Sequence, residues 1–118
     1  MIRNNNTEIG RRAEQRVADL LVARGCILLG TNVRVGRDEL DVVAVDGSVL
    51  IVVEVRARRR GSAAHPLETI DARKADRIRR AAMRYMAAHG AEELRIDVAA
   101  VSGDAIELIE NAIDFTST

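Results

Sequence analysis

The sequence predicts an α/β protein, a mixed β-sheet with helices packed against it, in the order α-β-β-β-α-β-β. Segments 7–24 and 71–89 carry apolar residues at helical spacing, whereas the other apolar runs are short and rich in β-branched residues. A strand, a helical crossover and a further strand of these lengths favour a mixed sheet. At 118 residues we expect a single domain, 1–118, with its core at about 7–112.

The first helix is expected over 7–24, with Asn6 or Thr7 as its N-cap and Gly25 as its C-terminal stop. Glu14 falls on or beside the apolar stripe of this helix, not opposite it. A carboxylate at that position points toward the sheet or its rim.

Three strand candidates follow at 26–35, 39–46 and 48–57, the first interrupted at Gly30. Asp46-Gly47 is typical of a tight hairpin turn, so we expect these strands to form an antiparallel meander. The next segment, GSAAHP, clusters Gly, Ser and Pro and is expected to be a loop.

The second helix is expected over 71–89, with Asp71 as its N-cap and Gly90 at its end. Two strands, 94–101 and 105–113, then complete the chain. The last strand could be a sheet edge available for pairing, so a homodimer is one expectation.

Composition narrows the function classes. Tyr85 and Phe115 are the only aromatic residues, which argues against base stacking on an aromatic platform. Apolar runs are far shorter than the roughly 20 residues of a membrane span, and the N-terminal MIRNNNTEIGRR lacks the apolar stretch of a signal peptide. We therefore expect a soluble cytoplasmic protein with no membrane partner.

Cysteine and histidine usage bears on metals. Cys26 is the only cysteine, and His65 and His89 lie far apart, so we expect neither a disulfide within the chain nor zinc. Oxygen ligands remain for any metal.

The charge distribution is uneven although the net charge is zero. Residues 56–84 hold ten basic and three acidic side chains, whereas 92–118 hold one basic and seven acidic side chains. A local basic region can attract nucleic-acid phosphates. A solvated helix face whose arginines pair with acidic neighbours is the alternative.

Carboxylates on strands are the main chemical signal. Side chains alternate along a strand, so Glu39 and Asp41 share one face, as do Glu54 and Arg56. A hairpin would bring Asp41 and Glu54 together, and two half-buried carboxylates repel unless a cation lies between them. Mg²⁺ or Mn²⁺ would satisfy both, and Glu14 could add a third oxygen. Alternatively, arginines such as Arg34 and Arg56 neutralise the pair without a metal.

Five blocks of the sequence, in order, resemble a known family: GRRAEQRVADLLVARG, NVRVGRDELDVVAVDG, LIVVEVRAR, RKADRIRRAAMRYM and RIDVAAV. They look like the YraN-type family of small bacterial endonuclease-like proteins, over about residues 9–101. That family is similar to the PD-(D/E)xK nuclease superfamily and to archaeal Holliday-junction resolvases. The resemblance implies a restriction-endonuclease-like fold, a mixed β-sheet flanked by helices.

The resemblance also implies residue roles. Glu14 matches the helix glutamate, Asp41 the metal-binding aspartate and Glu54 the acidic member of the (D/E)xK motif. Arg56 stands where that motif has lysine. Arginine cannot act as a base, but it can hold a phosphate oxygen and stabilise developing negative charge.

Lys74 is the single lysine among seventeen arginines and lies in the first turn of the second helix. We hypothesise that Lys74 reaches the metal site and supplies the missing ammonium. A surface lysine is the alternative.

Further arginines follow the motif strand or line the second helix and are candidates for phosphate contacts: Arg58, Arg59, Arg60, Arg73, Arg77 and Arg80. For each of them, a solvated surface role is the alternative.

Two functions follow from these patterns. The first is a metal-dependent endonuclease-like protein that hydrolyses phosphodiester bonds in DNA, including branched or flapped DNA, with Asp41 and Glu54 as metal ligands, Arg56 and Lys74 as further catalytic residues, and Mg²⁺ or Mn²⁺ as cofactor. The second is a non-catalytic nucleic-acid-binding or protein-interaction module that retains the nuclease fold.

Overall fold

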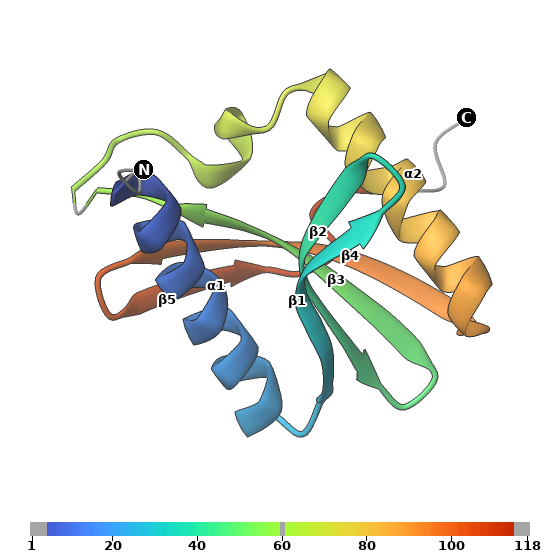
Figure 1. Ribbon diagram of the computed structural model, residues 1–118. Helices are drawn as coiled ribbons and strands as arrows, with labels where there is room; N and C mark the ends of the chain where they lie inside the picture. Colours follow the sequence, from blue (N-terminus) through green and yellow to red (C-terminus); the bar gives the residue numbers. More distant parts are fainter. Residues whose placement is uncertain (1–4, 60, 115–118) are drawn as a thin grey trace.

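The computed structural model describes residues 5–59 and 61–114, and its elements follow the predicted order (Figure 1). They are α1 (Asn5–Ala23), β1 (Ile27–Val35), β2 (Asp38–Asp46), β3 (Val49–Ala57), the 3₁₀ helix η1 (Pro66–Thr69), α2 (Ala72–His89), β4 (Glu93–Ser102) and β5 (Ala105–Ile109). The five strands form one sheet in the order β1-β2-β3-β4-β5. Only β3 and β4 are parallel, so the sheet is mixed and the predicted fold class is confirmed.

The helices cover opposite faces of the sheet, so β3 is buried on both sides (Figure 1). On one face α1 packs Val17 and Leu21 against Ile51 and Val53. On the other, α2 and the chain after β5 pack against alternate sheet residues; this core includes Leu50, Val52, Ile78, Ala82, Ile96 and Ile113. No helix in 5–59 or 61–114 is long and apolar enough to cross a membrane.

The boundaries of α2 agree with its sequence signals. The Asp71 carboxylate caps the helix by accepting a bond from the Lys74 N–H at 2.8 Å. At the other end, Gly90 adopts a left-handed conformation, with φ at 71°, and donates its N–H to the Met86 carbonyl. These caps fix where the first turn of α2 begins, and therefore where Lys74 lies.

The start of α1 differs from the prediction. The helix begins at Asn5, so Asn6 and Thr7 lie within it and neither is the N-cap. Its end agrees better: Gly25 has φ at 95°, and the Cys26 N–H donates to the Leu21 carbonyl at 3.0 Å.

Turns and a bulge shape the three-stranded meander. Asp46 pairs with Val49, so the turn residues are Gly47-Ser48, one position later than predicted. Gly47 supplies the positive φ, 61°, that the first turn position requires. Gly30 does not interrupt β1; the register shifts between Leu28 and Gly30, as in a β-bulge.

Candidate active site

The candidate site lies where β2 and β3 separate. Their ladder ends at the pair Val42 and Val53, whereas β3 continues to pair with β4 as far as Ala57. Just past the end of the ladder, the Val55 N–H donates to the Asp41 carboxylate at 2.9 Å. The strands therefore open at Asp41, and a carboxylate occupies the space between them.

Asp41 and Glu54 form a carboxylate pair at this opening. The register that pairs Val42 with Val53 places Glu54 opposite Asp41. Glu54 is only 5% exposed. Burial and the charge of Glu54 raise the pKa of Asp41 to about 8, against the opposing effect of the Val55 hydrogen bond. The two carboxylates therefore repel each other when both are charged, and a cation bound between them would relieve this repulsion.

Two cations approach the other side of Glu54. Lys74 Nζ lies 3.1 Å from Glu54 Oε2, and Arg56 Nη1 lies 3.4 Å from the same oxygen. Arg56 is largely committed elsewhere, because Nε donates to Thr69 Oγ1 and Nη2 to the Thr69 carbonyl, both at 2.9 Å. The hypothesised approach of Lys74 to the site is therefore present in the geometry. Through its bonds to Thr69, Arg56 connects η1 to β3.

Glu14 approaches the same region from α1. It is half-buried, and its carboxylate accepts a bond from Asn32 Nδ2 at 2.9 Å. Burial raises the pKa of Glu14; the Asn32 bond opposes this, and the charges of Glu39 and Glu54 add to it. Asn32 was not predicted as a residue of the site. Its positive φ, 51°, depends on the local course of β1, and no motif marks it.

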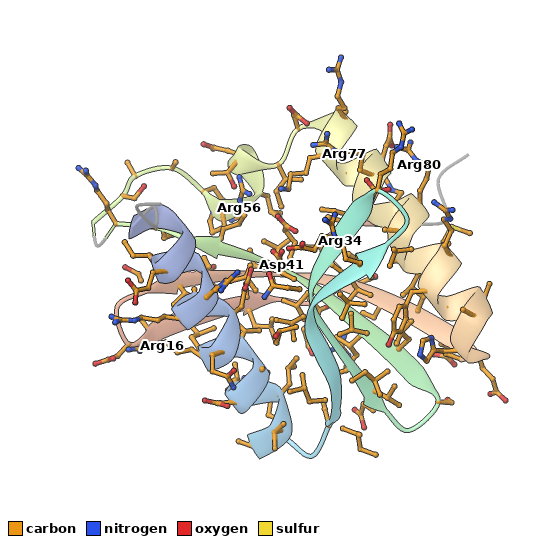
Figure 2. The ribbon with its side chains drawn as sticks, in the orientation of Figure 1. Arg16, Arg34, Asp41, Arg56, Arg77 and Arg80 are labelled. Carbon is orange, nitrogen blue, oxygen red and sulfur yellow. The ribbon has the colours of Figure 1, made fainter. Side chains whose placement is uncertain are left out.

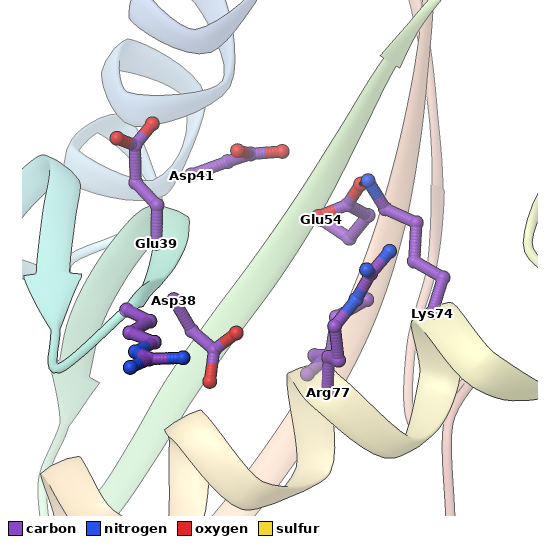
Figure 3. Close-up of a pocket in the computed structure, with 8 residues that line it drawn as sticks. Asp38, Glu39, Asp41, Glu54, Lys74 and Arg77 are labelled. Carbon is purple, nitrogen blue, oxygen red and sulfur yellow. Dashed lines mark ion pairs between the residues drawn. The ribbon is translucent and has the colours of Figure 1, made fainter.

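A polar pocket of about 320 Å³ opens over the carboxylate pair (Figure 3). Its walls come from the start of β2, from β3 and from α2, and are formed by Arg37, Asp38, Glu39, Asp41, Glu54, Lys74, Arg77 and Ile78. Arg37 and Asp38 were not predicted as site residues. Arg37 lies in the β1–β2 turn and Asp38 begins β2, and their position over the site depends on how this hairpin folds back toward α2. Within the described residues, no three His, Cys, Asp or Glu side chains converge as a ready metal cluster.

The predicted phosphate-binding arginines fall into two groups. Arg58 donates to the Ser62 and Ala64 carbonyls at 2.7 and 2.5 Å and thereby holds the loop, while Arg59 is exposed and Arg60 lies outside the described residues. In contrast, Arg73, Arg77 and Arg80 are exposed on α2. Figure 2 shows Arg77 and Arg80 on the same side of the molecule as Arg34 of β1, near Asp41.

Fold and site together define an α/β protein with a mixed five-stranded sheet and a buried carboxylate pair that opens into a polar, basic-rimmed pocket. Residues 13–101 match the model of the uncharacterised protein family UPF0102, and the chain belongs to this family. The UPF0102 protein of Sorangium cellulosum is 45% identical over 88% of this chain and 79% of its own length. Those of Streptomyces coelicolor and Chromohalobacter salexigens are 40% and 36% identical, over 83% and 94% of this chain and 78% and 97% of their own lengths.

Proposed function

We propose that this protein is a metal-dependent endonuclease that hydrolyses phosphodiester bonds in DNA, branched or flapped DNA included, in the cytoplasm. The observation that carries the proposal is the Asp41–Glu54 pair in an open pocket, with the Lys74 ammonium 3.1 Å from Glu54. The buried Glu54, the half-buried Asp41 and a cation at one opening are groups that metal-dependent phosphodiester hydrolysis can use.

The donor set fits Mg²⁺ or Mn²⁺. Mg²⁺ commonly binds through one or two carboxylates and keeps several waters, so Asp41 and Glu54 suffice as protein ligands without a third converging acid. Glu14 would act through water, because its carboxylate is already held by Asn32. When bound, the metal would supply a hydroxide-like water and Lewis-acid stabilisation of the phosphate.

Lys74 and Arg56 have different roles in the proposed reaction. The only hydrogen bond or ion pair of the Lys74 side chain in the described structure is to Glu54, so its ammonium is free to turn toward a phosphate oxygen. Arg56 is fixed at both ends, by Thr69 and by Glu54. We therefore assign charge stabilisation at the phosphate to Lys74, and the positioning of Glu54 and η1 to Arg56.

Calorimetric titration with Mn²⁺, paired with cleavage assays on single-stranded, duplex and branched DNA, tests the proposal. Asp41→Asn and Glu54→Gln preserve side-chain shape and should abolish both Mn²⁺ binding and cleavage. Glu107→Gln, on the exposed surface of β5, is the matched control and should change neither. Wild-type protein that binds no Mn²⁺ would refute the assignment of the site.

The second candidate function is a nucleic-acid-binding or protein-interaction module without turnover. It is favoured by the arginine at the lysine position of the motif, whose guanidinium is tied to Thr69 and cannot act as a base. Mn²⁺ binding with no cleavage of any of the three DNA forms would select this alternative.

A further inference from the structure

The arginines of this protein differ in whether the fold uses them. Within the described residues, several form hydrogen bonds or ion pairs that hold the structure together: Arg12, Arg16, Arg56, Arg58, Arg79 and Arg95. Others in the same part of the chain are exposed and have no such partner: Arg11, Arg24, Arg34, Arg37, Arg59, Arg73, Arg77, Arg80 and Arg84. Most of this second group lies on just two elements, the β1–β2 hairpin and α2.

These two elements meet beside the pocket. The Arg84 guanidinium lies against Gly36 at the hairpin turn, so closely that a Cβ on Gly36 would be 3.1 Å from Arg84 Nη1. Arg37, next to Gly36, and Arg77, on α2, both line the pocket itself. The hairpin and the helix therefore form one continuous basic rim.

The described acidic residues near this rim form no ion pairs with its arginines. Asp38 and Glu39 line the same pocket as Arg37 and Arg77 without pairing to them, and Asp76 on α2 is paired with Arg79 at 2.6 Å. Among the described residues the rim arginines therefore have no ion-pair partner, and each carries a full charge at neutral pH. A row of unpaired guanidinium groups leading to an acidic pocket fits a phosphate backbone better than a neutral or cationic ligand.

We propose that the backbone of a DNA strand lies along this rim, from Arg34 on β1 and Arg37 in the β1–β2 turn to Arg77 and Arg80 on α2. The hairpin turn is then a substrate-binding element, and Arg58 is not part of the track, because its guanidinium holds its own loop. The route to the cleavage centre rests on the proposed function, whereas DNA binding by the rim does not.

Salt-dependent binding of labelled duplex DNA tests this track. All variants carry Asp41→Asn so that no cleavage occurs, and anisotropy is measured between about 50 and 200 mM salt. Because each phosphate contact contributes about 0.9 to the slope of log K against log salt, Arg37→Gln with Arg80→Gln should reduce the slope by about 2 and weaken binding equally for unrelated sequences. Circular dichroism checks that these exposed changes leave the fold intact.

The matched control is Arg11→Gln with Arg24→Gln, two unpaired arginines of which one lies on α1 and the other just after its end, and it should leave the slope unchanged. An equal loss of slope in this control would overturn the track, as would a larger loss from Arg59→Gln alone. Wild-type protein that cleaves DNA while the rim variants keep the full slope would refute the track and leave the proposed function standing. Wild-type protein that binds DNA through the rim but never cleaves it would refute the proposed function and leave the track standing.

Discussion

Two buried carboxylates on neighbouring strands have opposite surroundings. Glu54 on β3 and Asp97 on β4 are 5% and 0% exposed, and each has an arginine two residues away on its own strand. Asp97 accepts bonds from Arg95 Nε at 3.0 Å and Nη2 at 3.0 Å, and from the Asn111 N–H at 2.8 Å. Its hydrogen bonds with Arg95 raise the pKa of that guanidinium. Its charge is neutralised within the fold.

Glu54 has no such closed arrangement. Its arginine bonds mainly to Thr69, its second cation comes from α2, and it lies against another acid, Asp41. Each acid lies one residue past the end of a ladder, because β2–β3 pairing stops at Val53 and β4–β5 pairing stops at Val98. Beside Asp97 the chain after β5 closes the gap, since the Asn111 N–H donates to this carboxylate. Beside Glu54 the gap holds a second acid, Asp41, and opens into the pocket. The comparison teaches that a buried acid with a nearby arginine is structural where the following chain closes its surroundings, and available for chemistry where a second acid and a pocket lie beside it.

Breaking the closed pair should have the largest effect on stability. Asp97→Ala removes the partner of Arg95 and of the Asn111 N–H, and we expect a loss of about 2–4 kcal/mol in the free energy of unfolding. This expected loss in the free energy of unfolding is smaller than the full cost of breaking a buried ion pair, because the Arg95 side chain is 29% exposed and can be rehydrated. Urea denaturation measures the loss. A change under about 1 kcal/mol would contradict a structural role for Asp97.

Removing the Lys74 ammonium from the open site should affect the reaction more than the fold. Lys74→Ala should lower the rate of metal-dependent cleavage by about 10²-fold, the usual scale for losing one charge-stabilising group. Lys74→Arg, which retains the charge, should recover much of the rate in single-turnover assays. Equal rates for wild type and both variants would remove Lys74 from the proposed mechanism.

Removing the charge repulsion between Asp41 and Glu54 should stabilise the metal-free protein. The pKa of Asp41 is raised from 3.8 to about 8 in the fold, so the folded state holds this proton more tightly and wild-type stability falls as pH rises from about 4 to 8. Asp41→Asn lacks this titration and should exceed wild type by about 1–2 kcal/mol above pH 8.

Thermal unfolding across this pH range, without divalent ions, measures the effect. Glu92→Gln, at an exposed position between α2 and β4, is the control and should follow the wild-type pH profile. If wild-type and Asp41→Asn stabilities change in parallel with pH, Asp41 does not carry the proton.

The smallest effect is expected at the arginine of the open site. Arg56→Lys keeps a cation near Glu54 but cannot reproduce two bonds to Thr69 from one planar group, so we expect a loss of about 0.5–1.5 kcal/mol. Arg56→Gln should cost a similar amount if positioning of η1 dominates. Hydrogen exchange at the η1 amides distinguishes this local loosening from global unfolding. Unaltered exchange in both variants would contradict the positioning role.

Much of the fold follows from local signals. Asp71 and Gly90 bound α2 because a capping carboxylate and a left-handed glycine act within one helical turn. The approach of Asp41 to Glu54 was predicted from strand alternation and one hairpin, because a two-residue turn fixes register along the whole ladder. The error at Asp46-Gly47 was a one-position shift in the turn.

Long-range contacts decided the rest. The sequence shows Glu54 with Arg56 and Asp97 with Arg95 at the same spacing. Only the tertiary structure makes one site open and the other closed, because it brings Asp41 and Lys74 to Glu54 but the Asn111 N–H to Asp97. Likewise, the sequence gives the number of arginines, but only tertiary contacts determine which of them bond to Thr69, Ser62 or Asp76 and which have no partner. Periodicity and capping act between residues close in the chain. The sequence alone therefore determined the elements and the pairing of the acids. The balance of charge around each acid depends on residues brought together from distant segments, and only the tertiary structure decided it.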